Sequence, residues 1–399
     1  MKPCCKLIIW FVFCVTGWSM GGAVFADTAN GLSVAYALDN PKLGEMLKQF
    51  GHKHQIPIAS RSIDADELKA ELIQRANTDS LPDAVIVPAD FLGLPNLKFS
   101  PVLSDFTNKI DNEQVKQTAS INGSVLGLPI MTGNHLLLYV NRALIKKTAT
   151  DWEALESQQQ RLPANTELIG WSFNEMYWFI PFLTAFDGDT LQNGKVSLDT
   201  VAMQQALNFY WGLSQKGVVE HQCDYRCATD KFKQGKLAYL ISGFWAYDEL
   251  ENELADNLQV AALPSINGHA MRSYFTSYVL AFPGNSLYGR KRESLQKLAA
   301  YFIDSQQQQR LWQELKALPA EKSALYGLMQ QHDLNLQVAI TQLNQSVPLP
   351  SQFSMAVVWE SMSIGFRRYG AGIVTAEQAS RLMQHLAEKS ANASLTRVE

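Results

Sequence analysis

Residues 31–60, GLSVAYALDNPKLGEMLKQFGHKHQIPIAS, hold a strand, a helix and a second strand in quick succession, and this order sets the class of the fold. Residues 32–38 form a short apolar run that is typical of a buried strand, and the turn Asn40-Pro41 follows it. Apolar side chains then recur on one face of a predicted helix, at Leu43, Met46, Leu47 and Phe50. Residues 56–60 predict the second strand.

The same alternation continues along the chain. After a charged amphipathic helix at 64–77, residues 84–87 predict another buried strand. Further strands are predicted at 135–141, 167–173, 236–242 and 258–264, and further helices at 151–162, with Asp151 as N-cap, 201–217 and 293–315. Strands and helices joined by short links indicate an α/β architecture with a largely parallel sheet.

The first 26 residues have the pattern of an export signal. Lys2 and Lys6 give a positive start, residues 7–15 are apolar, and Val24 and Ala26 precede a predicted cleavage before Asp27. The apolar run is shorter than the roughly 20 residues that span a bilayer, so an uncleaved membrane anchor is the less favoured alternative. We therefore expect an exported protein.

Without residues 1–26 the chain has 399 − 26 = 373 residues, which indicates two domains. Loss of Lys2 and Lys6 changes the formal net charge from −4 to −6, which argues against nucleic acid as a partner. The sequence contains no G-x-S-x-G elbow, no H-E-x-x-H motif and no phosphate-binding loop. We therefore expect no enzyme activity and no cofactor.

Two cysteines, Cys223 and Cys227 in CDYRC, remain after the signal is removed. An even pair in an oxidising compartment predicts a local disulfide. The C-x3-C spacing differs from the redox C-x-x-C, and no other cysteine completes a zinc set, so no metal site is predicted.

Several longer motifs occur in an order that resembles a known family. They are LPDAVIVPADFLGL (81–94), NGSVLGLPIMTGNHLLLYVNRALI (122–145), TDWEALE (150–156), FNEMYWFIPFLTAFDGD (173–189), DKFKQGKLAYLISGFWAYDEL (230–250) and VAALPSINGHAMRSYFTSYVLAF (260–282). The chain resembles the sugar-binding members of the extracellular solute-binding proteins of ABC importers over nearly its whole length after the signal.

The resemblance implies a two-lobe periplasmic-binding-protein fold of type II, with a ligand cleft between the lobes and hinge crossings that join them. The first α/β lobe would hold residues 27–131 and 280–322, and the second would hold 136–277 and 328–399. The implied function is delivery of a maltodextrin or another oligosaccharide to the membrane permease of an ABC importer, by a monomer.

A sugar site needs carboxylates and amides for the hydroxyls and flat aromatic rings for the C–H faces. The stretch FNEMYWFIP (173–181) holds both kinds of group. By resemblance, Glu175 and Tyr177 contact the ligand, whereas Trp178, Phe179 and Phe182 are predicted core residues. The alternative for Glu175 is an acid favoured by the helix dipole.

The resemblance also implies ligand contacts for Trp245, Trp359, Asp90 and Asp39. Trp245 opens a helix after a strand, and Trp359 follows a proline-containing loop at a longer offset than in the family. On the first lobe the match is thinner. Val87 and Phe91 stand where the family has a Trp and an Arg, and Asn134 or His135 stands in place of an acid.

These departures leave the ligand open. The alternatives are a non-sugar polar solute, such as a polyamine, a cofactor or an iron chelate, and a sensor or chaperone that has kept the fold without transport. A glycosidase would need a second acid paired with Glu175, and the sequence offers none nearby.

Overall fold

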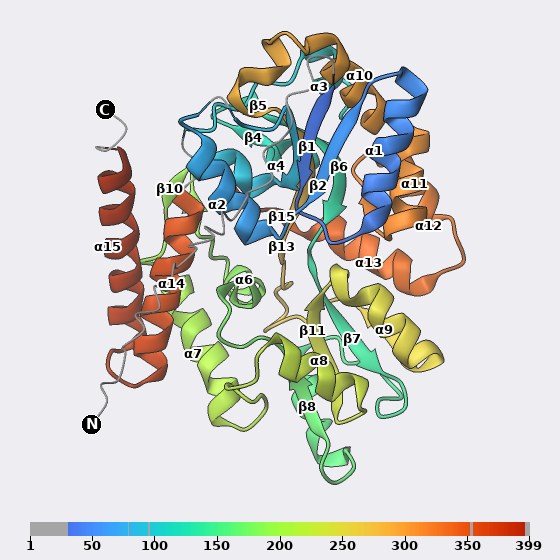
Figure 1. The fold of residues 1–399 in the computed structure, drawn as a ribbon. Helices are drawn as coiled ribbons and strands as arrows, with labels where there is room; N and C mark the ends of the chain where they lie inside the picture. The colour runs from blue at the N-terminus through green and yellow to red at the C-terminus, as the bar shows by residue number, and fades with distance from the viewer. Residues whose placement is uncertain (1–30, 79, 95, 352–353, 396–399) are drawn as a thin grey trace, which may run out of the picture.

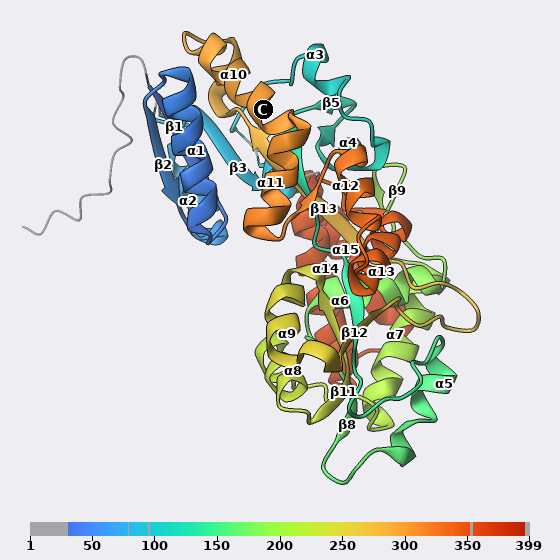
Figure 2. The same ribbon diagram turned by 90° about the vertical axis from the view of Figure 1, so that its right-hand side faces the viewer.

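The computed structural model describes residues 31–78, 80–94, 96–351 and 354–395, and the predicted signal peptide lies outside them. The described chain forms two separate large sheets with helices packed around them (Figures 1 and 2). The first sheet has the order β14 (Leu318–Pro319), β6 (Gly127–Gly133), β13 (Tyr274–Ala281), β3 (Ala84–Pro88), β1 (Leu32–Tyr36), β2 (Ile58–Ser62), and β15 (Val347–Pro348) pairs with β13. The second has the order β12 (Leu258–Ala261), β7 (Leu136–Asn141), β11 (Leu237–Gly243), β8 (Glu167–Gly170).

The first sheet confirms the start of the predicted alternation. Strand β1 pairs in parallel with β2 and β3, and α1 (Pro41–His54) joins β1 to β2. The Asn40 side chain accepts a hydrogen bond from the backbone N–H of Lys42 and so caps α1. Strand β13 is antiparallel to both β3 and β6, and β7 of the second sheet is antiparallel to both of its neighbours, so both sheets are mixed and the prediction of a largely parallel sheet was wrong.

Alternate residues of the strands face opposite sides of this sheet, and each side has its own core. Ala84 and Ile86 of β3 pack in a cluster with α1, α10 (Arg292–Ile303) and α11 (Ser305–Leu315). Val85 and Val87 pack in the opposite cluster with α2 (Ala65–Arg75) and the 3-10 helix η1 (Ala89–Gly93).

The prediction of one helix over 293–315 was wrong. The chain leaves the helical conformation at Asp304, which has φ −66° and ψ 131°. Its carboxylate accepts hydrogen bonds from the backbone N–H groups of Gln306 and Gln307, and this cap starts a second helix, α11. Residues 306–309 are all glutamine, which is favourable in a helix, so the sequence did not show that α10 ends before them.

The second sheet is also covered on both faces. Leu136, Leu138 and Val140 of β7 pack in one cluster, and Leu137 and Tyr139 pack in the other. The helices around it are α5 (Trp152–Glu156), α6 (Met176–Ala185), α7 (Val201–Gln215), α8 (Tyr225–Lys233), α9 (Tyr247–Leu254), α13 (Leu334–Gln345), α14 (Ser354–Gly370) and α15 (Ala376–Leu395). Helix α12 (Lys322–Met329) contacts β14 of the first sheet and the helices α11 and α13. Helices α14 and α15 run side by side along one edge of the molecule (Figure 1).

The remaining elements are short: α3 (Ser104–Thr107), α4 (Glu113–Thr118), η2 (Gln159–Arg161), η3 (Phe244–Ala246), η4 (Ala255–Asn257), η5 (Pro283–Tyr288) and the hairpin pairs β4 (Ser120–Ile121) with β5 (Ser124–Val125) and β9 (Leu191–Gln192) with β10 (Lys195–Val196). The predicted N-cap Asp151 of α5 is confirmed, because its carboxylate accepts the backbone N–H of Ala154. Within the described ranges, no helix has both the length and the apolar character that crossing a membrane requires.

The chain passes between the two sheets more than once. Asn134 and His135 alone link β6 of the first sheet to β7 of the second. The chain returns from β12 to β13, and later runs from α13, which packs on β12, through β15 to α14. Strand β13 extends across the predicted limits at residues 277 and 280, and the lobe limits themselves stay a prediction.

Candidate ligand-binding site

The segment that precedes α6 is fixed by buried aromatic side chains. Trp171 and Phe173 follow β8 and are fully buried. The indole N–H of Trp171 donates to the Tyr210 hydroxyl over 2.6 Å, and that hydroxyl donates to the Phe173 carbonyl over 2.8 Å. This anchor brings the next two residues, Asn174 and Glu175, to the surface at the start of α6.

Helix α6 lies near the middle of the molecule and is buried over almost its whole length (Figure 1). Trp178 is 8% exposed, and Phe179 and Phe182 are 0% exposed, so their prediction as core residues is confirmed. Tyr177 is only half-buried, and Glu175 is exposed. The division between core and surface residues within this short stretch follows the sequence prediction.

Tyr177 is at the centre of an aromatic group. Its ring centroid lies 6.4 Å from that of Trp245 and 6.3 Å from that of Trp359. Its hydroxyl lies 2.6 Å from the carbonyl oxygen of Asn134 and 3.0 Å from that of Tyr274, and it donates to this pair. Burial raises the pKa of the Tyr177 hydroxyl, which therefore stays protonated as a donor at neutral pH.

One cavity, which we call the aromatic pocket, has a volume of about 380 Å³ and lies beside the N-terminus of α6. It is lined by Asn174, Glu175, Met176, Tyr177, Trp359, Ser363 and Arg367. Three of the predicted ligand contacts, Glu175, Tyr177 and Trp359, therefore meet in one place. The pocket combines a carboxylate, a guanidinium group and two aromatic rings.

A second cavity, the interlobe pocket, has a volume of about 240 Å³ and lies between strands β6, β13 and β14 of the first sheet and the helices η3 and α9, which follow strand β11 of the second sheet. Its lining residues are Leu38, Met131, Thr132, Gly133, Asn134, Phe244, Trp245, Tyr247, Asp248, Thr276, Tyr278, Leu315, Lys316, Ala317 and Leu318. Trp245 is 43% exposed and presents its ring to this pocket. The Tyr177–Trp245 contact thus lies between the two cavities.

Two hydroxyls in the wall of the interlobe pocket lack a partner. The side-chain oxygens of Thr132 and Thr276 are buried and make no hydrogen bond within the described part of the chain. The register pairs Thr132 with Ser277 and Thr276 with Gly133, so the two threonine side chains point to opposite faces of the sheet and do not converge on one point of the pocket.

The two predicted first-lobe acids line neither pocket. Asp90, in η1, lies 3.2 Å from the ammonium group of Lys69. Tyr278, which lines the interlobe pocket, is paired with Pro88 of β3, two residues before Asp90. Burial raises the pKa of Tyr278, and the negative charge of Asp90 raises it further. Asp39 is exposed and follows Leu38, which lines the same pocket. Ligand contact by either acid stays a prediction.

The structure separates the two residues that replace the family's acid. Asn134 lines the interlobe pocket. His135 is fully buried, and its Nε2 lies 2.8 Å from the Ala339 carbonyl oxygen on α13. Burial lowers the pKa of His135 to about 4, although that hydrogen bond opposes the shift, so the ring is neutral and structural.

Sequence reasoning missed several lining residues. Ser363 and Arg367 lie one and two helical turns beyond Trp359 on α14, so helical spacing from that tryptophan would have found them. Lys316 in the interlobe pocket carries no local signal, because it follows α11 far from the other site residues in the sequence.

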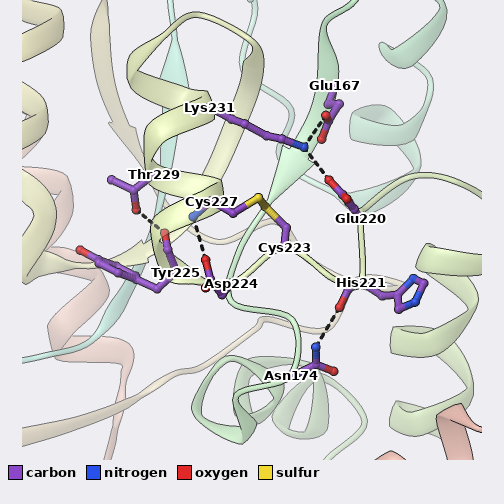
Figure 3. Close-up of a disulfide and its surroundings, with 10 residues drawn as sticks. All are labelled: Glu167, Asn174, Glu220, His221, Cys223, Asp224, Tyr225, Cys227, Thr229 and Lys231. Carbon is purple, nitrogen blue, oxygen red and sulfur yellow. Dashed lines mark hydrogen bonds and ion pairs between the residues drawn. A yellow bond between two sulfur atoms is a disulfide. The ribbon is translucent and has the colours of Figure 1, made fainter.

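The structure joins Cys223, which precedes α8, to Cys227 in the first turn of α8 by a disulfide (Figure 3). The Asn174 side-chain amide donates to the His221 carbonyl over 2.9 Å, which ties the cysteine loop to the residue before Glu175. Lys231 pairs with both Glu167 and Glu220. Glu220 lies close to both sulfurs, but with its carboxylate paired and the sulfurs bonded we propose no metal site here.

A model of the bacterial extracellular solute-binding protein family matches residues 45–331. The chain belongs to this family. The solute-binding protein is also 23% identical to the "Maltooligosaccharide ABC transporter solute-binding lipoprotein" of Streptococcus pneumoniae serotype 4, over 79% of this chain and 78% of the relative. It is 23% identical to the "Galactooligosaccharide-binding protein" of Bacillus subtilis, over 75% and 74% respectively.

The fold of this solute-binding protein matches a solved structure, the "Maltose/maltodextrin-binding domain MalE from Bdellovibrio bacteriovorus bound to maltotriose". The TM-score is 0.78 at 21% sequence identity, and the match covers 90% of this chain and 99% of that one. The predicted family and the predicted two-lobe α/β fold are confirmed.

Proposed function

We propose that this solute-binding protein binds an oligosaccharide between its lobes and delivers it, chemically unchanged, to the permease of an ABC importer. The observation that carries the proposal is the meeting of Glu175, Tyr177, Trp245 and Trp359 at the N-terminus of α6, along two adjoining cavities. Rings in this arrangement suit the C–H faces of successive sugar residues, and the carboxylate suits their hydroxyls.

The relatives give the same ligand class. The two curated relatives described above are named for maltooligosaccharide and galactooligosaccharide, and the solved structure of similar fold holds maltotriose. Asn134 and Lys316, which line the interlobe pocket, add a side-chain amide and an ammonium group for hydroxyls. We propose Asp90 and Asp39 as outer contacts that a longer ligand would reach.

Charge in the aromatic pocket disfavours a polyamine. Such a ligand would need several carboxylates, whereas Glu175 is the one acid among the residues that line this pocket, and Arg367 lines it too. A cationic ligand would meet both an attractive and a repulsive charge there. A neutral ligand with many hydroxyls can use both groups as hydrogen-bond partners.

We further propose that the protein acts as a monomer in the periplasm after cleavage before Asp27. Family membership supports a location outside the cytoplasm, and the sequence of residues 1–26 supports the cleavage. Uptake of the bound sugar by cells with and without this chain tests its role in import, and equal uptake would count against it.

A thermal-shift screen of the chain from Asp27 tests the ligand class. Maltotriose, a galactooligosaccharide, spermidine and a ferric chelate are compared at equal concentration. A ligand at 100 times its Kd adds about 2.7 kcal/mol to the stability of the folded state, so the Tm rises by a few degrees. We expect this rise with at least one oligosaccharide. A rise with the amine or the chelate and with neither saccharide would contradict the proposal.

We propose that the Cys223–Cys227 disulfide forms in the exported protein and holds the loop that contacts Asn174. Because residues 27–399 contain only these two cysteines, the expected result is simple. A thiol reagent should find no free thiol in the denatured, unreduced protein and two after reduction. Two free thiols before reduction would show that the bond is absent.

A further inference from the structure

The Tyr177 hydroxyl contacts two of the places where the chain passes between the sheets. Asn134, whose carbonyl is 2.6 Å away, lies in the two-residue link between β6 and β7. Tyr274, whose carbonyl is 3.0 Å away, is the first residue of β13, where the chain re-enters the first sheet. These contacts join one helix of the second lobe to both passages.

We propose that Tyr177 is a hinge tether as well as a wall of the ligand site. Its hydroxyl holds the β6–β7 link and the start of β13 at a fixed position relative to α6. Its ring contacts the rings of Trp245 and Trp359, on which the ligand is proposed to pack. One side chain therefore connects the occupied site with the segments about which the lobes turn.

The backbone of the link shows why a tether there would matter. Gly133, the last residue of β6, has φ +139°, and Asn134, the first residue of the link, has φ +58°, so two successive residues where β6 ends have positive φ. Rotation about these bonds moves one sheet relative to the other, because the strands on either side belong to different sheets. A hydrogen bond to the Asn134 carbonyl restrains that rotation directly.

The Tyr274 carbonyl extends the restraint to the second segment, the start of β13. One hydroxyl carries one hydrogen, so the carbonyls of Asn134 and Tyr274 share it. Both the β6–β7 link and the start of β13 must therefore stay within hydrogen-bonding distance of the Tyr177 hydroxyl for the shared bond to persist. The contacts lie among buried and half-buried residues, where a lost hydrogen bond is not readily replaced by water.

The coupling to ligand rests on the proposed function, whereas the tether does not. A ligand that packs on the Tyr177 ring favours whichever lobe arrangement keeps that ring in place, and it shifts the population through this difference in affinity. The tether itself should be detectable in the protein without ligand.

The test compares Tyr177→Phe, which keeps the ring and removes the hydroxyl, with the wild type. Spin labels at Gln49→Cys on α1 and Glu253→Cys on α9, both exposed, report the distance between the lobes. We expect a broader distance distribution for Tyr177→Phe without ligand, and a three- to tenfold loss of affinity for the saccharide that binds the wild type.

Tyr210→Phe is the matched control. The Tyr210 hydroxyl also makes two hydrogen bonds, but both partners, Trp171 and Phe173, lie in the second lobe. This variant should lower the Tm and leave the distance distribution as in the wild type. Tyr177→Leu, which also lacks the hydroxyl, provides a second measurement if the Phe variant folds poorly.

Equal distributions for the wild type, Tyr177→Phe and Tyr177→Leu without ligand would overturn the tether. Failure of every saccharide to bind the wild type would instead refute the proposed function, and the ligand-free comparison would still test the tether. Broadening in both Tyr177 variants together with an unchanged Tyr210→Phe distribution would support it.

Discussion

Replacing Glu175 and Trp245 together by alanine is expected to lower the affinity for oligosaccharide about 1,000-fold. Truncating a central aromatic or charged contact in a binding site costs about 2 kcal/mol, and two such losses add to about 4 kcal/mol. Glu175 lines the aromatic pocket and Trp245 the interlobe pocket, so the pair removes one contact from each cavity. Isothermal titration with the saccharide found by the thermal-shift screen measures the change.

The double variant should fold normally, because Glu175 is exposed and Trp245 is 43% exposed. Glu293→Ala, an exposed acid at the start of α10 in the other lobe, is the control for loss of a carboxylate and should bind as the wild type does. Retained affinity in the double variant would refute the site while leaving the protein's class unchanged.

Replacing Gly243 by alanine should displace Trp245 without altering its chemistry. A Cβ added at Gly243 would lie 1.9–2.2 Å from three ring carbons of Trp245, far inside any real contact. The backbone itself accepts alanine, since Gly243 has φ −78° and ψ 164°. The ring must therefore move, and we expect an affinity loss of about 30-fold, similar to deletion of the ring.

Gly212→Ala on α7 is the matched control, because a Cβ there meets no atom within 4 Å. It should leave affinity unchanged and stabilise the helix slightly. Titration and the fluorescence of the two variants give the comparison. Wild-type affinity in Gly243→Ala would mean that the ring position of Trp245 does not matter for binding.

Much of the fold was predictable because its signals are local. Strand β3 and helix α1 are each specified by short apolar patterns, and Asp151 caps its helix as its position in the sequence predicts. The break at Asp304 was not predicted, since the polar residues 304–310 are also typical of the exposed face of one continuous helix.

The site was predictable only where its residues are neighbours in the sequence or match a motif. Glu175 and Tyr177 stand together in one such motif, and the structure places them in one pocket. Thr132 and Thr276 belong to strands whose pairing joins distant parts of the chain, so no window of sequence contains both. The hydrogen bonds of Tyr177 to two passages of the chain depend in the same way on long-range topology.

Strand β13 has a consequence for anyone who wishes to divide the protein. It lies between β3 and β6, yet it is translated only after the whole of the second sheet. A polypeptide that ends before residue 274 would lack β13 and leave the edges of β3 and β6 unpaired, so that each could pair with a strand of another chain. Separate lobes therefore cannot be obtained by one cut in the gene, and a permuted order of segments is needed instead.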